Sequence, residues 1–307
     1  MVWLFYVVIL AGLFYPPQLG STVVTLKPVA DTTLIEAVPD NNMGAQSFFN
    51  AGTTASGLHN HGLLKFNVSD TLPPGSRITR ASLKLEVVFE PQSSVMQSTY
   101  FRLHRLLQPW GEGNKTSNGA TPGLGAMATL NEATWNHRFS GTNLAWSAPG
   151  GEEGNDFVTS HSASQFIYGI LNSPYVFDSA TDPQLKADVQ LWLDAPQSNF
   201  GWLLKPDDDL LTGTARRFGS REDPSNAPLL DIEFVPPPAI ENTRLTGSEL
   251  EFSFSAEAAQ PYIVQFKNTL EESWSTLTNI PPASQGASVV VRDGLSTSRR
   301  FYRVLAP

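Results

Sequence analysis

The chain has no cysteine in 307 residues, so disulfide bonds and thiolate metal sites are excluded. Its stability must come from packing and hydrogen bonds, or from a hard cation held by oxygen ligands. It also has no block of like-charged residues, although its formal net charge is -9. Because nucleic acid and anionic membranes are bound by concentrated basic patches, neither is an expected partner.

No apolar stretch is long enough to cross a bilayer, which takes about 20 residues. Residues 1–15 are almost wholly apolar but end at Pro16-Pro17. Such a run is typical of the core of a signal peptide, so we expect residues 1–21 to be removed and the protein to be secreted, extracellular or at the cell surface. No Lys or Arg precedes the run and no Ala-x-Ala site follows it, which leaves a buried N-terminal strand as the alternative.

The short motifs of common enzymes are also missing. The sequence has no Gly-x-Ser-x-Gly, no His-Glu-x-x-His and no phosphate loop. Residues 123–128 (GLGAMA) imitate a dinucleotide fingerprint, but no strand pattern precedes them. We therefore expect a protein that is not an enzyme. The alternative is a jelly-roll polysaccharide lyase or hydrolase, for which His137 and Tyr168 are the candidate bases.

Turn-forming residues are frequent, with 23 glycines and 23 prolines, which favours short strands over long helices. Leu83, Leu85 and Val87 alternate with Lys84 and Glu86, as expected of an antiparallel strand with one buried face. Similar patterns predict strands at residues 23–26, 33–35, 63–68, 100–106 and 201–204. Many short strands separated by turns indicate an all-β sandwich or jelly roll.

One segment has helical spacing. Leu185, Val189 and Trp192 predict a helix over 185–193 that ends before Pro196. Residues 164–171 fit a short helix or a strand equally well. The surrounding stretch, 110–182, is rich in Gly, Asn and Ser, which predicts a long functional or mobile loop region.

Three consecutive prolines at 236–238 predict a stiff linker between two domains. Residues 22–235 form the expected jelly-roll domain. Residues 239–307 have strand patterns of their own, at 249–255, 262–267 and 288–292. This part resembles the small C-terminal β-sandwich modules of secreted multidomain bacterial proteins, which implies an immunoglobulin- or fibronectin-III-like sandwich.

Several separated segments of 28–235 match one known pattern in order. A strand (NFGWLLK, 199–205), a turn (RRFGSRE, 216–222) and a proline-led strand (PLLDIEF, 228–234) end the domain. Earlier matches are ADTTL (30–34), NMG (42–44), LLKFN (63–67), ITRASL (78–83), WGE (110–112), ATWN (133–136), Trp146 and PGG (149–151). The series resembles the DNRLRE family of secreted bacterial β-sandwich modules.

The resemblance implies an antiparallel jelly-roll sandwich that is non-catalytic, lies outside the cell and binds polysaccharide or mediates extracellular attachment. The chain departs from the family at 59–62 (HNHG), where an Arg more often precedes the Leu-Leu pair, and at an insertion over 115–130. Both lie in or beside expected loops, so they concern the ligand rather than the fold. The alternative function is a structural surface or matrix protein without a defined ligand.

Two groups of side chains are candidates for ligand binding. Exposed aromatic rings stack on the flat faces of sugars, which makes Trp110 and Trp146 in the loop region candidate platforms, with core packing as the alternative. Arg216, Arg217 and Arg221 form the densest basic group. Arginine grips carboxylates with two parallel hydrogen bonds, so these residues predict uronate binding, unless they pair with Glu222 and Asp223.

A candidate calcium site lies in the first loop. Asp31, Asn41, Asn42 and the carbonyl of Gly44 offer the hard oxygen ligands that calcium prefers, and calcium is common in jelly-roll carbohydrate modules. The same residue types also serve as ordinary turn residues. For residues 207–209 (DDD) a solvated turn is the preferred interpretation over a metal site.

Overall fold

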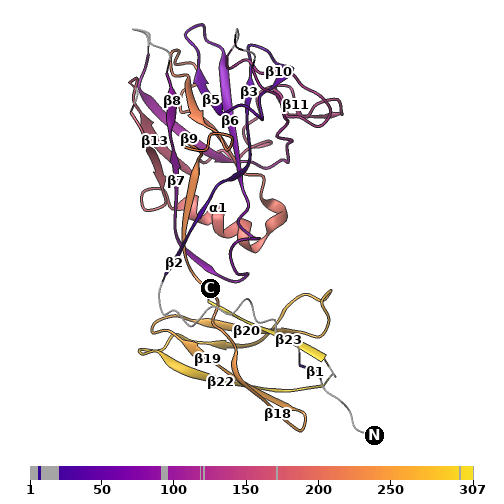
Figure 1. The fold of residues 1–307 in the computed structure, drawn as a ribbon. Coiled ribbons are helices and arrows are strands. Elements are labelled where there is room, and N and C mark those ends of the chain that lie inside the picture. Colours follow the sequence, from indigo (N-terminus) through magenta and orange to yellow (C-terminus); the bar gives the residue numbers. More distant parts are fainter. Residues whose placement is uncertain are drawn as a thin grey trace. The chain divides into compact units, whose positions relative to one another are not determined.

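The computed structural model describes residues 6–7, 21–90, 96–117, 119, 122–170, 172–296 and 299–306. Nearly all regular structure is β, arranged in several mainly antiparallel sheets (Figure 1), which confirms the predicted all-β class. Within the predicted signal segment 1–21, only residues 6–7 and 21 are described, so that prediction lies mostly outside the described residues. No helix of the described part is long and apolar enough to cross a membrane.

The chain divides into two compact units. The larger contains residues 23–71 and 78–233, and the smaller contains residues 234–306 together with 72–77 and, at the N-terminal side, the described residues 6–7 and 21–22. The division after residue 233 lies close to the three prolines at 236–238. The inclusion of 72–77 in the smaller unit has no signal in the sequence, because these residues lie between two segments of the larger unit.

The larger unit is built on an eight-stranded sheet with the order β13-β9-β15-β6-β5-β16-β8, in which β3 also pairs with β6. Its strands are β3 (Pro28–Ile35), β5 (Phe48–Thr53), β6 (His59–Phe66), β8 (Val87–Phe89), β9 (Thr99–Arg105), β13 (Ala163–Ile167), β15 (Trp202–Pro206) and β16 (Arg216–Gly219). Residues 164–167, for which the sequence left helix and strand open, are thus in a strand.

A second sheet has four strands in the order β14-β7-β17-β2. These are β2 (Thr22–Leu26), β7 (Arg77–Leu85), β14 (Tyr175–Asp178) and β17 (Leu229–Val235). Leu83 and Leu85 are fully buried while Lys84 is not, as the alternation predicted. Short strands form two further pairs, namely β10 (Ala126–Met127) with β4 (Asn41–Asn42), and β11 (His137–Phe139) with β12 (Leu144–Ala145).

The predicted helix is confirmed as α1 (Pro183–Asp194). Proline fits its first turn, because the N–H that proline lacks would have no partner there. Leu185, Val189 and Trp192 are fully buried, and the Trp192 ring lies 4.4 Å from that of Trp202 on β15. The chain then continues as a short 3-10 helix, η1 (Pro196–Ser198).

The two faces of the eight-stranded sheet have different surroundings. One face carries the main apolar residues of the unit, including Phe101, Trp202 and Phe218, all fully buried. On the other face, a long loop over residues 106–160 packs over Leu63 and Leu203. The cluster under this loop contains Leu34, Leu63, Leu106, Ala133, Trp135, Trp146, Phe157 and Leu203. The loop therefore covers only part of that face.

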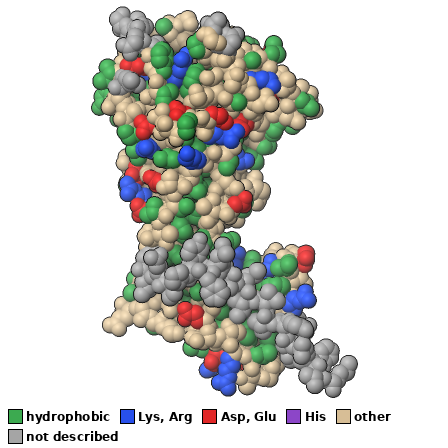
Figure 2. Space-filling model, viewed as in Figure 1, with side chains coloured by type: hydrophobic (Ala, Val, Ile, Leu, Met, Phe, Trp, Pro, Cys, Tyr) green, Lys and Arg blue, Asp and Glu red, His purple; other side chains and the backbone are tan. Residues whose placement is uncertain are grey.

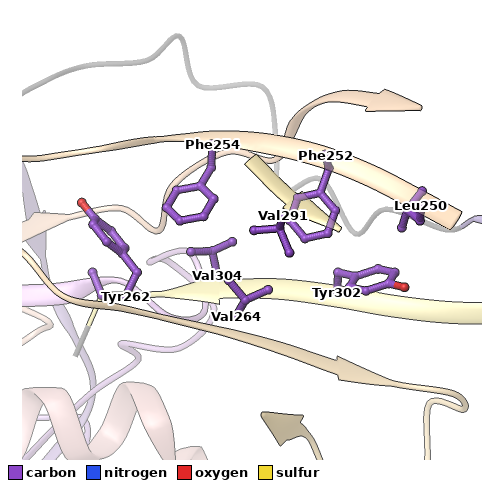
Figure 3. Close-up of a cluster of buried hydrophobic side chains, with 9 residues drawn as sticks. Leu250, Phe252, Phe254, Tyr262, Val264, Val291, Tyr302 and Val304 are labelled. Carbon is purple, nitrogen blue, oxygen red and sulfur yellow. The ribbon is translucent and has the colours of Figure 1, made fainter. Parts of the chain in front are cut away.

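The smaller unit has a three-stranded sheet, β18-β19-β22, and a four-stranded sheet, β1-β23-β20-β21. The strands are β1 (Tyr6–Val7), β18 (Glu241–Thr246), β19 (Glu249–Ala256), β20 (Tyr262–Lys267), β21 (Ser275–Ile280), β22 (Ala287–Gly294) and β23 (Arg299–Leu305). Phe252 and Phe254 of β19 point toward Val264, Tyr302 and Val304 of the other sheet (Figure 3), and all five are buried. The unit thus has an apolar core of its own.

Candidate functional site

Three of the family-like segments, ADTTL, WGE and RRFGSRE, meet at one charged cluster. Glu112 accepts two hydrogen bonds from the Arg221 guanidinium, at 2.5 and 3.0 Å, and a third from the backbone N–H of Asp31. Asp31 in turn accepts a hydrogen bond from the backbone N–H of Arg221 at 2.7 Å. Glu222 lies 2.9 Å from Arg221. Residues more than a hundred positions apart are therefore joined by charge-assisted bonds, which are stronger than neutral ones.

The negative charge of the buried Asp31 carboxylate is unfavourable in this cluster. Asp31 is 1% exposed, and burial raises its pKa well above the usual range, with further increases from Glu222 and Glu112. Burial also raises the pKa of Glu112, although Arg221 partly offsets it. The Arg221 guanidinium forms ion pairs with Glu112 and with Glu222. The pair with Glu222 agrees with the pairing alternative for this residue. Its guanidinium already has the partners that a uronate would supply.

The cluster predicts a pH effect on stability. Because the pKa of Asp31 is higher in the folded than in the unfolded chain, the folded protein binds a proton where the unfolded chain does not. The contribution of this proton to the stability of the folded protein is fully present below the usual pKa of aspartate. It is lost as the pH rises through the raised pKa of Asp31 in the folded protein. We expect the melting temperature of the wild type, measured relative to that of Asp31→Asn, to rise as the pH is lowered from 7 to 5. Asp70→Asn, at an exposed aspartate, is the control, and a constant wild-type to Asp31→Asn difference across this range would contradict the prediction.

The residues of the predicted calcium site are occupied by internal hydrogen bonds. The Asn42 amide donates to the carbonyls of Glu112 and Ala133, and its oxygen accepts from the N–H of Gly44 and of Lys115. Asn41 donates to the carbonyl of Leu124. Among the described residues, no group of three or more Asp, Glu or His side chains is placed to hold a metal. Asn42 therefore ties the first loop to the long loop, and a calcium ion there stays a prediction.

The two candidate tryptophans are held by the protein itself. Trp146 is 4% exposed, lies in the cluster under the long loop, and donates its indole N–H to the carbonyl of Thr134. Trp110 is partly buried against the same cluster and donates to the carbonyl of Phe200. Trp146 has no free face for a sugar, so the expected stacking platform does not exist at this residue. Core packing, the alternative interpretation, describes its position.

Arg216 and Arg217 also serve the fold, but not through Glu222 or Asp223. Arg216 is 1% exposed and lies 3.8 Å from buried Glu90. Its guanidinium donates to the backbone carbonyls of Gln97, Tyr168, Gly213 and Ala215. The Arg217 guanidinium lies 4.5 Å from the ring centres of both Phe48 and Phe89 and donates to Pro122. The three arginines therefore do not form one binding patch.

The histidines at 59 and 61 pack side by side at the edge of the cluster under the loop. Their ring centres are 6.5 Å apart, and the His61 ring lies 5.2 Å from that of Trp135. His61 contacts the carbonyl of Gly150 through Nδ1 and faces Asp209 through Nε2 at 3.7 Å. His137, a candidate base, lies in β11, outside this group.

Three aromatic rings, two exposed and one half-buried between them, lie on the part of the sheet that the long loop leaves open. Tyr100 of β9 contacts Phe166 of β13, with ring centres 5.1 Å apart and planes at 71°. Phe166 contacts Tyr168, with ring centres 5.2 Å apart. Tyr100 is 51% exposed and Tyr168 48%. Large aromatics usually bury most of their surface, so three rings in contact on an open face need an explanation. We call these residues the aromatic ladder.

Charged side chains continue the same face beside the ladder. Arg102, two residues after Tyr100, is paired across the sheet with Lys205 of β15. Arg102 forms an ion pair with Asp207 at 2.9 Å, and Lys205 forms one with Asp209. Asp207 also donates its backbone N–H to the carbonyl of Tyr100. The ladder and two ion pairs thus form one continuous surface on β13, β9 and β15, which we call the ladder face.

Sequence reasoning missed most of the ladder face. Of its residues, Tyr168 was a candidate catalytic base, and Asp207 and Asp209 were expected in a solvated turn. The alternation of Tyr100, Phe101, Arg102 and Leu103 did place Tyr100 and Arg102 on one side of a strand. Which side faces solvent depends on where the long loop packs, and the sequence carries no signal for that.

Comparisons with known proteins add little. No family model matches the chain, and no match was found among curated proteins. Among solved structures it shows a likeness to a β-1,2-glucanase from Parabacteroides distasonis, at 9% identity and a TM-score of 0.18. The match covers 94% of this chain but only 37% of the glucanase. A likeness this weak carries no argument about fold or activity.

Proposed function

We propose that this protein is a secreted, non-catalytic module whose larger unit binds extracellular polysaccharide through the ladder face. The observation that carries the proposal is the aromatic ladder on an open part of the sheet, in which Tyr100 and Tyr168 are exposed and contact the half-buried Phe166. The C–H faces of sugar rings stack on such rings, and the neighbouring ion pairs supply hydrogen-bond donors and acceptors. The smaller unit, with its own core, would act as an adaptor.

The proposed ligand, a polysaccharide, is the one that the sequence predicted, but the proposed binding site is the ladder face rather than the tryptophans and arginines. The tryptophans and arginines singled out in the sequence are used internally, whereas the ladder rings have free surface. The cluster of Asp31, Glu112 and Arg221 joins three of the segments on which the resemblance to the DNRLRE family rests. Its role in the proposal is to hold Glu112, near the start of the long loop, against β3 and the segment of Arg221.

Binding is expected to weaken when ladder rings are removed. Stacking contacts between aromatic rings contribute about 0.5–1.5 kcal/mol beyond area burial, so each of Tyr100→Ala and Tyr168→Ala should weaken polysaccharide binding about twofold to tenfold. The double variant should lose more. Affinity electrophoresis in gels that contain soluble polysaccharides measures this effect, and melting curves check that the variants are folded.

Phe89→Ala is the matched control, since Phe89 is an aromatic residue on β8 with 44% exposure and lies outside the ladder. It should leave retardation in the gel unchanged. Retardation that survives the double tyrosine variant would exclude the ladder as the site. Absence of retardation by every polysaccharide tested would instead favour a structural surface protein, and release of reducing ends or unsaturated sugars would favour an enzyme.

A further inference from the structure

The charges of the ladder face bear on which polysaccharides it accepts. Both cations of the face are already compensated, since Arg102 pairs with Asp207 and Lys205 pairs with Asp209. Asp208, between the two aspartates, is exposed and contacts the backbone N–H of Leu210. Two cations and three carboxylates therefore lie beside the ladder. The formal charge of these five side chains is therefore negative by one.

No other described cation around the ladder is free to receive an anionic sugar. Arg216 contacts the carbonyl of Tyr168 but is 1% exposed and faces Glu90. His161 lies 3.8 Å from Asp182, so it also faces a carboxylate. On the side of the molecule drawn in Figure 2, charged side chains of both signs are interspersed rather than gathered in a basic area. A sugar carboxylate at the ladder would have to compete with Asp207 for Arg102 or lie close to Asp208.

An uncharged sugar neither competes with Asp207 for Arg102 nor is repelled by Asp208. The Arg102–Asp207 pair is accessible, with side-chain exposures of 35% and 42%, and it places donors beside acceptors. A hydroxyl group both donates and accepts, so two neighbouring hydroxyls of a pyranose can accept from the guanidinium and donate to the carboxylate while the ion pair stays intact. The backbone bond from Asp207 to Tyr100 holds this pair beside the aromatic ring.

We propose that the ladder face selects neutral polysaccharides with free vicinal hydroxyl groups and excludes chains rich in uronic acids. The inference rests on the proposed function, because it concerns the ligand of the same site. It departs from the uronate expectation drawn from Arg216, Arg217 and Arg221. Selection would arise from repulsion by Asp207, Asp208 and Asp209 as much as from attraction, which is a common source of specificity.

The test is affinity electrophoresis of the full chain in gels with neutral probes (a soluble β-glucan, galactomannan and xylan) or acidic probes (alginate and polygalacturonate). We expect retardation by at least one neutral probe, none by the acidic probes, and weaker retardation of Tyr100→Ala. Asp208→Lys should be retarded by an acidic probe at low salt, where the wild type is not, and should lose this retardation as salt is added. Asp194→Lys makes the same charge change at the end of α1 and should not acquire it.

The possible results separate the inference from the proposed function. If acidic probes retard the wild type as strongly as neutral ones, and Tyr100→Ala weakens that retardation, the ladder is the site and the selection for neutral chains is wrong. The selection is also wrong if Asp208→Lys and Asp194→Lys behave alike. If no probe retards the wild type, or Tyr100→Ala has no effect, the proposed function fails and the inference fails with it.

Discussion

Replacing Arg216 with alanine is expected to destabilise the larger unit by about 3–5 kcal/mol, the usual cost of removing one partner of a buried ion pair. The change leaves Glu90, which is 6% exposed, without its cation. It also removes the donor that joins the carbonyls of Gln97, Tyr168 and Gly213. Chemical denaturation of the full chain, followed by tryptophan fluorescence, measures the loss.

Arg217→Ala is the matched control for this change. Arg217 is the next residue of β16 but lies partly exposed between the rings of Phe48 and Phe89. A cation–π contact of this kind contributes about 0.5–2 kcal/mol, so the control should cost clearly less. Arg216→Lys should recover only part of the stability, because lysine keeps the charge but not the planar set of donors. Equal losses for Arg216→Ala and Arg217→Ala would show that the carbonyl contacts of Arg216 contribute little.

A second large effect is expected at Asp188 in α1. This carboxylate is 1% exposed and accepts hydrogen bonds from Ser162, Gln184 and the indole N–H of Trp202, and it forms an ion pair with Arg105 at 3.2 Å. Asp188→Ala leaves the Trp202 N–H buried without a partner and Arg105 without its carboxylate. We expect a loss of about 3–5 kcal/mol in the free energy of unfolding.

Asp194→Ala provides the comparison on the same helix. Asp194 is exposed and accepts a hydrogen bond from the neighbouring Gln190 side chain, so its removal should change stability by less than about 0.5 kcal/mol. Asp188→Asn should lie between the wild type and Asp188→Ala, since the amide retains one acceptor for Trp202. If Asp188→Ala unfolds at the same denaturant concentration as Asp194→Ala, this network does not hold α1 against the sheet.

The elements predicted well are those that bury one face only, because their buried and exposed residues then alternate in a regular pattern along a short stretch of sequence. Leu83 and Leu85 in β7 and the helix with Leu185, Val189 and Trp192 carry their periodicity in consecutive residues. Strand β18 was missed for the opposite reason, because five of its six residues are exposed and no alternation marks it. Strand β5 was missed because five of its six residues are buried, which also removes the alternation.

The candidate site was predicted less well, because its residues depend on long-range packing. Arg216 and Tyr100 are the clearest cases. An arginine in a basic run is expected at the surface, yet Arg216 is buried because carbonyls from two distant segments, at Gln97 and Tyr168, converge on it. The exposure of Tyr100 likewise depends on the long loop, which packs over Leu203 and leaves the β9–β13 part of the sheet open.

The open position of the ladder has a consequence for how a polymer would be held. Tyr100 and Tyr168 each keep about half of their surface exposed on a sheet, so the rings are not enclosed in a cavity. A site of this form does not require a free chain end, and it can bind an internal stretch of a long chain from the side. Many copies of the protein could then bind along one polysaccharide molecule. Short oligosaccharides, which offer few overlapping positions, would be retained much less than the intact polymer.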